Sequence, residues 1–332
     1  MSDLSRTVRD LMTPGKGLLA ADESNQSADE KRLAPYGIKT GPEMRRKFRD
    51  LLLATPGIEA YLTGVILYEE TLSQKADNGT LFSELLAKAG ILPGIKVDQG
   101  LDPLEENGKE TITKGLFGLS DRLAEYRATH GARFTKWRAA IRIEGDALPS
   151  KKALLENAKR LATYACEAQK EGLVPILEPE VLLEGKHSRV RAKKVIEETM
   201  TILFDTLNEQ CADLSCVILK TSMVLSGKDS GRIDTPEEVA EDTVAALMAT
   251  VPAGVGGIVF LSGGQTPDQA TENLRAITKR ARDVKAPWPL TYSYARALQE
   301  EALAIWKGEE GNVEQAREVF MKRLEKVASA VA

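Results

Sequence analysis

The chain has 332 residues, of which 42% are hydrophobic and 5% aromatic, so it can build one large α/β barrel or two ordinary domains. Its 45 basic and 49 acidic residues give a net charge of −4 without a basic block, which excludes nucleic acid as an expected partner. No segment approaches transmembrane length, and the first residues lack the apolar core of a signal peptide. We therefore expect a soluble, cytoplasmic protein that binds no membrane.

Eight short apolar segments alternate with longer segments of helical pattern. In chain order, the candidate strands cover residues 17–21, 64–68, 93–97, 132–138, 174–178, 216–220, 257–261 and 289–293. Each is followed by enough residues for a helix, which predicts an α/β fold with a parallel sheet closed on itself, the (β/α)₈ TIM barrel. No composition break or long polar linker divides the chain, so we expect a single domain over residues 1–332 rather than two.

Several helix ends are also marked in the sequence. Thr235 and Thr266 each precede a proline and are followed three residues later by Glu or Gln, which predicts a capping box at both helix starts. Ser150 precedes a helical pattern that runs to about Glu171, where Gly172 can take the left-handed conformation that ends a helix.

The three cysteines, Cys166, Cys211 and Cys216, are odd in number and lack metal-type spacing. Cys216 opens an apolar run, and Cys166 lies in a helical pattern. We therefore expect reduced thiols in the core of an intracellular protein rather than a disulfide framework.

Ionisable residues gather where the predicted strands end. They are Asp22 and Glu23, Glu69 and Glu70, Lys96 and Asp98, Lys136 and Arg138, Glu178 and Glu180, and Lys220. Side chains two apart on a strand point to the same face, so these pairs can project together into the mouth of a barrel. A single pair is more often an ordinary surface ion pair, but recurrence on successive strands favours an active site.

Lys220 ends the apolar run that starts at Cys216. A lone lysine in this position usually extends to water. Among the other strand-end charges, a neutral Lys220 is better explained as a nucleophile that forms an imine with a ketone or aldehyde. Lys136 would favour the neutral amine by like-charge repulsion, Glu178 would shuttle protons, and Asp22 would act on a substrate hydroxyl.

Two groups of residues are candidate phosphate sites. A Ser-Gly-Gly turn after the seventh strand lets backbone N–H groups approach an anion near a helix start, and an arginine follows the eighth strand (Ser262, Gly263, Gly264 and Arg296). The second group follows the first strand (Ser24, Ser27, Lys31 and Arg32). Taken without the first group, the second would be better explained as a solvated helix face.

Several sequence blocks, in this order, resemble class I fructose-1,6-bisphosphate aldolase. They are residues 15–24, 94–98, 136–138, 174–180, 219–220, 261–265 and 293–298, and together they span nearly the whole chain. The resemblance implies that Lys220 is the Schiff-base lysine and that Glu178 is the acid and base of carbinolamine chemistry. It also implies that Asp22 assists cleavage and that Lys136 is a proton-relay and electrostatic residue.

The resemblance further implies the substrate and its contacts. It places one phosphate on Ser262, Gly263, Gly264 and Arg296, and the other on Ser24, Ser27, Lys31 and Arg32, with Lys96, Arg138 and Glu180 also binding substrate. The implied reaction is reversible cleavage of fructose 1,6-bisphosphate to dihydroxyacetone phosphate and glyceraldehyde 3-phosphate, in glycolysis and gluconeogenesis. No metal or other cofactor is implied, and a homotetramer is the expected assembly.

The chain departs from the common family pattern at several places. Residues 24–32 form a loop one residue longer than usual, and Ala295 stands where the family has a glycine close to phosphate. Residues 221–223 differ from the usual proline and asparagine after the Schiff-base lysine. The chain also ends at Ala332 without the C-terminal tyrosine of many relatives, so we expect protonation of the enamine to use another group or to be slower.

Three alternatives remain at this point. The enzyme could prefer another phosphorylated ketose, such as sedoheptulose 1,7-bisphosphate or fructose 1-phosphate. A metal-dependent aldolase is disfavoured, because the chain has only two histidines, His130 and His187. A non-catalytic binding protein on the same scaffold would be expected to lack the lysine or its proton shuttle, yet Lys220 and Glu178 are both present.

Overall fold

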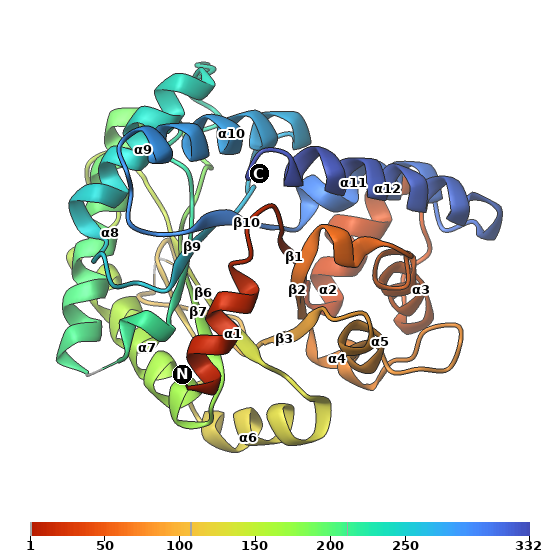
Figure 1. Ribbon diagram of the computed structural model, residues 1–332. Helices are drawn as coiled ribbons and strands as arrows, with labels where there is room; N and C mark the ends of the chain where they lie inside the picture. Colours follow the sequence, from red (N-terminus) through yellow and green to blue (C-terminus); the bar gives the residue numbers. More distant parts are fainter. Residues whose placement is uncertain (1, 107, 211) are drawn as a thin grey trace.

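Eight parallel strands close into a barrel in this computed structural model, which describes residues 2–106, 108–210 and 212–332. The strands are β1 (Gly17–Ala21), β2 (Leu62–Leu67), β3 (Leu92–Lys96), β6 (Phe134–Ile141), β7 (Val174–Val181), β8 (Ile218–Thr221), β9 (Gly257–Phe260) and β10 (Leu290–Tyr294). Their order around the barrel is β1-β10-β9-β8-β7-β6-β3-β2, and the helices form a ring outside them (Figure 1). The predicted TIM barrel is confirmed, and each predicted strand segment overlaps one barrel strand.

The predicted start of β8 lies two residues before the observed one. Cys216 lies not in the strand but in a 3₁₀ turn, η4 (Leu214–Cys216). Asp213 caps this turn by accepting a hydrogen bond from the backbone N–H of Ser215 at 3.0 Å, so the chain extends only from Val217 onward. The side-chain cap overrides the apolar run that predicts an earlier start.

The twelve α-helices of the described residues complete the ring and its additions. They are α1 (Asp3–Leu11), α2 (Asn25–Ala28), α3 (Pro42–Leu53), α4 (Glu69–Ser73), α5 (Phe82–Lys88), α6 (Leu119–His130), α7 (Lys151–Lys170), α8 (Arg189–Glu209), α9 (Pro236–Thr250), α10 (Pro267–Asp283), α11 (Arg296–Trp306) and α12 (Val313–Ala328). Both predicted capping boxes are present, at Thr235 and Thr266. Ser150 caps α7, and Gly172 follows its end with φ 73°.

The interior of the barrel is a packed core at the amino ends of the strands. Alternate strand residues face inward there, among them Leu18, Ala20, Ile66, Phe134, Val174, Ile176, Ile218 and Val259. Val8 and Leu11 of α1 join this cluster together with Met12, the residue after the helix, and α1 lies across the centre of the ring (Figure 1). The amino end of the barrel is therefore closed by apolar side chains, which leaves the carboxyl end for a cavity.

A short antiparallel hairpin of β4 (Leu101–Pro103) and β5 (Thr111–Thr113) follows β3, and the sequence pattern does not predict it. Its strands are three residues long, too short to show a clear alternation of apolar and polar residues. The Thr113 hydroxyl donates a hydrogen bond to the backbone oxygen of Arg138 at 2.8 Å, which holds the hairpin against β6.

Two of the three cysteines, Cys166 and Cys216, lie among the described residues. Cys216 is buried and belongs to no disulfide. Cys166 on α7 is partly buried, with its Sγ 3.2 Å from the backbone oxygen of Gln210, and Cys211 lies outside the described residues. None of the described helices is long and apolar enough to cross a bilayer.

Candidate active site

A cavity of about 660 Å³ opens at the carboxyl ends of the barrel strands. It is lined by every site residue that the sequence predicts: Asp22, Ser24, Ser27, Lys31, Arg32, Lys96, Lys136, Arg138, Glu178, Glu180, Lys220, Ser262, Gly263, Gly264 and Arg296. The structure brings these residues to one place, and the role of each remains a proposal.

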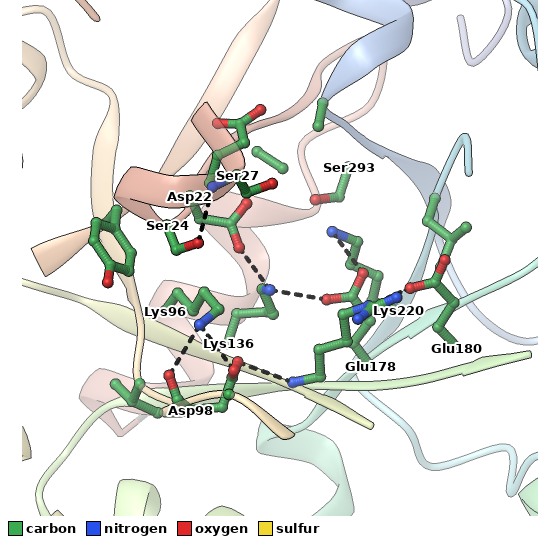
Figure 2. Close-up of a pocket in the computed structure, with 18 of the residues that line it drawn as sticks. Asp22, Ser24, Ser27, Lys96, Asp98, Lys136, Glu178, Glu180, Lys220 and Ser293 are labelled. Atoms are coloured by element: carbon green, nitrogen blue, oxygen red, sulfur yellow. Dashed lines mark hydrogen bonds and ion pairs between the residues drawn. The ribbon is translucent and has the colours of Figure 1, made fainter. Parts of the chain in front are cut away.

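Four of these residues form a continuous chain of ion pairs at the bottom of the cavity. Glu178 contacts two lysines, with Oε1 3.0 Å from Nζ of Lys220 and Oε2 3.1 Å from Nζ of Lys136. Lys136 in turn lies 2.6 Å from Oδ2 of Asp22. Figure 2 shows the Lys136 ammonium between the carboxylates of Asp22 and Glu178. Groups that could exchange protons are therefore within hydrogen-bond reach of one another.

The alternation of strand residues explains why these side chains face inward. On β8, Ile218 packs in the barrel interior, so Lys220, two residues later, points the same way. The same relation holds on β7 between Ile176 and Glu178. An apolar layer thus sits directly beneath the ionisable layer and excludes water from its lower side.

Burial and opposite charge set the ionisation of this cluster. Burial alone would raise the pKa of Asp22 and Glu178, but the nearby lysines outweigh it and lower both pKa values. Burial alone would lower the pKa of Lys136, but Asp22 and Glu178 outweigh it and raise that pKa well above its ordinary value. Without substrate, the cluster therefore holds two carboxylates and a firmly charged Lys136.

The structure modifies one expectation about Lys220. The sequence predicts that Lys136 favours the neutral Lys220 amine by repulsion, but the carboxylate of Glu178 bridges the two lysines. Its negative charge offsets that repulsion. Proton acceptance by Glu178 is thus the more direct route to a neutral amine.

Two further pairs line the wall formed by β3, β6 and β7. Nζ of Lys96 lies 2.8 Å from Oδ1 of Asp98 and 5.8 Å from the centre of the Tyr68 ring. Arg138 pairs with Glu180, and Glu180 is the main cause that raises the pKa of Arg138. Both cations therefore have anionic neighbours that hold them in place at the edge of the cavity.

The two glycines of the Ser-Gly-Gly turn between β9 and α10 lie close to neighbouring side chains. A Cβ on Gly263 would lie 2.9 Å from Oε1 of Glu180, and one on Gly264 would collide with Cδ2 of Leu183. Gly264 also has φ 79°, a left-handed conformation that favours glycine. Arg296 donates from Nη2 to the backbone oxygen of Gln265 at 2.9 Å, which ties it to this turn.

The second candidate anion site is built on two short helical turns after β1. Ser24 caps α2 by accepting a hydrogen bond from the backbone N–H of Ser27 at 3.3 Å. Lys31 and Arg32 then lie in a π-helical turn, η1 (Asp29–Leu33). A π-helix closes its hydrogen bonds over one more residue than an α-helix, which accommodates the extra residue inferred for this loop.

Not every strand-end charge enters the cavity. Glu69 lines it, but Glu70 points away and binds Arg45 of α3, with Oε1 2.6 Å from Nη2 of the arginine. Glu23 lines the cavity while its carboxylate binds Arg32 and Arg49. The sequence places these carboxylates at strand ends but does not show which way each one turns.

One cavity residue to which the sequence assigns no role is Ser293 on β10. Its hydroxyl is buried, faces the cavity, and has no hydrogen-bond partner among the described residues. Tyr292 and Tyr294 pack on the outer side of the strand, so alternation alone would have assigned Ser293 to the interior. Figure 2 shows Ser293 above Lys136, Lys220 and Glu178.

Within the described part of the chain, no group of three or more His, Cys, Asp or Glu side chains is arranged to hold a metal ion. The cavity itself contains an amine and several carboxylates, groups that can exchange protons. A (β/α)₈ barrel with a buried lysine paired with a carboxylate at its mouth is typical of the class of barrel enzymes.

Comparisons with known proteins agree with this class. The family model for class-I fructose-bisphosphate aldolase matches residues 3–332. The cytosolic fructose-bisphosphate aldolase 4 of Arabidopsis thaliana is 46% identical over 311 residues, covering 94% of this chain and 78% of the relative. The cytoplasmic isozyme of Spinacia oleracea is 46% identical over 313 residues, covering 94% and 86%.

A solved structure is similarly close in fold. It is fructose-bisphosphate aldolase from Plasmodium falciparum in complex with TRAP and a small-molecule inhibitor. The two share a TM-score of 0.95 and 40% sequence identity, over 99% of this chain and 94% of that chain. The chain belongs to the class-I fructose-bisphosphate aldolase family, and it is an enzyme of the lyase class.

Proposed function

We propose that the protein cleaves fructose 1,6-bisphosphate reversibly into dihydroxyacetone phosphate and glyceraldehyde 3-phosphate, as a step of glycolysis and gluconeogenesis. The observation that carries this proposal is the position of Lys220, buried and 3.0 Å from a carboxylate oxygen of Glu178. An amine beside a proton acceptor, at the base of a cavity with two candidate phosphate sites, suits imine chemistry on a sugar bisphosphate.

The first half of the proposed reaction forms the imine. Glu178 accepts a proton from the Lys220 ammonium, and the neutral amine attacks the C2 carbonyl of the open-chain ketose. Glu178 then returns a proton to the carbinolamine hydroxyl, which leaves as water. The resulting iminium carries a positive charge on the nitrogen of Lys220 and can accept electrons from the neighbouring carbon–carbon bond.

The second half breaks that bond. Asp22 accepts the proton of the C4 hydroxyl, and the C3–C4 bond breaks. The C4 fragment leaves as glyceraldehyde 3-phosphate, and the electron pair of the broken bond moves into the iminium to give an enamine. Lys136 lies 2.6 Å from Asp22, so its charge keeps the carboxylate available and it can relay the proton. Protonation of the enamine at C3 and hydrolysis of the imine then release dihydroxyacetone phosphate.

Two candidate phosphate sites support a bisphosphate substrate. One site comprises Ser262, Gly263, Gly264 and Arg296, and the other comprises Ser24, Ser27, Lys31 and Arg32. Further residues proposed to bind the substrate lie on the cavity wall formed by β3, β6 and β7: Lys96, Arg138 and Glu180. We also infer that the buried Ser293 hydroxyl contacts the substrate, because it faces the cavity without a described partner.

The preferred ketose is open to a direct test. We expect the kcat/KM for fructose 1,6-bisphosphate to exceed that for fructose 1-phosphate, because the monophosphate leaves one cationic site empty. Measuring both together with sedoheptulose 1,7-bisphosphate ranks the candidates. A higher kcat/KM for either alternative would replace the proposed substrate while retaining the imine mechanism.

We further propose that activity needs no metal, because the amine of Lys220 supplies the electron sink. Full activity after dialysis against EDTA is the expected result. A loss that is restored by added zinc or another divalent ion would contradict this part of the proposal.

The remaining expectations concern the whole protein. We propose that residues 1–332 act as one catalytic domain in the cytoplasm, where relatives described as cytosolic are found. We also propose a homotetramer, a state for which exposed apolar side chains such as Phe117 and Val190 provide contact area. Light scattering should then give four times the 36.2 kDa mass of one chain.

A further inference from the structure

Glu23, the residue after Asp22, is held from two sides by arginines. Its Oε1 accepts a hydrogen bond from Nε of Arg32 at 2.9 Å, and its Oε2 accepts one from Nη1 of Arg49 at 2.9 Å. Arg49 also donates from Nη2 to the backbone oxygen of Glu23 at 3.3 Å. The side chains of Arg49 and Glu23 are 3% and 6% exposed, whereas that of Arg32 is 17% exposed, so the ionic triad is buried at its centre and partly exposed at Arg32.

Arg49 comes from α3, outside the barrel, and it does not line the cavity, whereas Glu23 and Arg32 do. Its guanidinium is fixed further by the ring of Phe48, whose centre is 4.9 Å away. Arg49 is thus linked to the cavity only through Glu23. Glu23 in turn binds Arg32, the cation of the candidate phosphate site.

The charges of the triad explain why a second arginine is needed. Burial alone would raise the pKa of Glu23, but Arg49 and Arg32 outweigh it and lower that pKa, so the carboxylate is ionised. Paired with Glu23 alone, Arg32 would be neutralised and would attract a phosphate weakly. With Arg49 present the triad carries one net positive charge. Glu23 also uses only Nε of Arg32, so it does not consume the terminal nitrogens of the guanidinium.

We propose that Arg49 is a positioning residue for this active site. Arg49 neutralises the charge of Glu23 and holds its carboxylate in place. The Arg32 guanidinium, which Glu23 contacts, is thereby oriented toward a substrate phosphate and keeps its positive charge available to attract it. This inference rests on the proposed function and on the assignment of Arg32 to phosphate binding. It predicts that Arg49 acts on substrate affinity from a helix that does not line the cavity.

The test compares steady-state kinetics of the full-length wild type and variants with fructose 1,6-bisphosphate. Replacing Arg49→Met should raise KM about tenfold, the effect of weakening one charge-assisted phosphate contact, and should change kcat by less than about threefold. The same replacement in an Arg32→Met background should change KM by less than about twofold, because the two residues act as one unit.

A rescue experiment separates positioning from general stability. In the Arg49→Met protein, Glu23→Gln removes the carboxylate that now neutralises Arg32, so KM should fall back toward the wild-type value. Arg323→Met is the matched control, because Arg323 is also buried and pairs with two carboxylates, Glu301 and Asp268, but does not line the cavity. That control should lower the melting temperature and leave KM unchanged.

The outcomes are distinguishable. If wild-type protein cleaves the substrate and Arg49→Met lowers only the melting temperature, Arg49 is merely structural and the inference is wrong. An equal effect of Arg49→Met with and without Arg32 would also contradict it. A wild-type protein without cleavage activity would instead overturn the proposed function. Should Arg49→Met fail to fold, Arg49→Gln takes its place, because glutamine can still donate a hydrogen bond to Glu23 but has no charge to neutralise it, and a KM equal to wild type would then count against the inference.

Discussion

At the scale of single residues, Glu178 is the centre of the proposed chemistry. Its two carboxylate oxygens contact two different lysines, Lys220 at 3.0 Å and Lys136 at 3.1 Å. One lysine is the proposed nucleophile, and the other is held charged by Asp22 and Glu178. Glu178 can therefore exchange protons with Lys220 while Lys136 keeps it in its anionic form between cycles.

Replacing Glu178→Gln should lower kcat for fructose 1,6-bisphosphate by about 10²–10⁴-fold, the usual contribution of a general acid or base. The glutamine keeps the size of the side chain but can neither take nor return a proton. Stopped-flow and steady-state measurements of cleavage check this. A loss below about tenfold would mean that another group carries the protons.

The ion pairs of Lys136 should also be visible in the dependence of stability on pH. The pKa values of Asp22 and Glu178 are lowered from their ordinary values of 3.8 and 4.5. The unfolded chain therefore binds more protons in acid, so these carboxylates stabilise the fold above about pH 5 and lose that contribution as the pH falls below about 4.

Replacing Lys136→Met should destabilise the protein by about 3–5 kcal/mol at pH 7, since it leaves two buried carboxylates without their shared partner. Their pKa values should then rise, so the free energy of unfolding should fall less steeply between about pH 5 and pH 3 than in wild type. Urea unfolding at a series of pH values measures both effects, and parallel curves for the two proteins would refute the coupling.

The sequence predicts much of the site at this scale but not its pairings. Lys220, Glu178 and Lys136 could be found because each interrupts a buried strand with a charge at the end where barrel sites form. Arg49 and its pairing with Glu23 could not, because Arg49 lies 26 positions along the chain on an amphipathic helix. In the sequence, such an arginine is indistinguishable from one on a solvated face.

At the scale of elements, two turns shape the proposed phosphate sites. The π-helical turn η1 carries Lys31 and Arg32, and the glycine turn after β9 brings the backbone close to the cavity. The glycine turn is predictable from its composition. The π-helical turn is not predictable, because a single extra residue does not change the spacing of apolar residues enough to be recognised in the sequence.

Replacing Gly264→Ala should raise KM several-fold and lower stability by about 1–2 kcal/mol or more, because φ 79° disfavours any side chain and the new Cβ would meet Leu183. Gly231→Ala is the matched control, since Gly231 has φ 76° but an added Cβ there would meet no atom within 4 Å, and the residue does not line the cavity. The control should lose stability and keep its KM. Equal KM values for both variants and wild type would show that the turn does not bind substrate.

At the scale of the whole molecule, the barrel separates stability from chemistry. The amino end is filled by apolar side chains and covered by α1, while the ionisable layer lies at the carboxyl end. The eight strands are predictable because strands of a parallel barrel are short, buried and apolar. The β4–β5 hairpin is not, because its three-residue strands are too short to show an alternation of apolar and polar residues.

This separation predicts the behaviour of a core variant far from the site. Leu11 of α1 is fully buried beneath the barrel, so Leu11→Ala should destabilise the protein by about 2–5 kcal/mol. The kcat and KM of the folded protein should match those of wild type at a temperature where both are fully folded. A change in kcat with little loss of stability would show that the two ends of the barrel are coupled.

The central claim, that Lys220 forms an imine with the substrate, can be tested by chemical trapping. Wild-type protein is mixed with dihydroxyacetone phosphate, reduced with borohydride, and digested for mass spectrometry, with Lys220→Met as the control. We predict one stable adduct on Lys220, parallel loss of activity, and neither adduct nor activity in the control. An unmodified Lys220 in protein that is turning over substrate would contradict the mechanism.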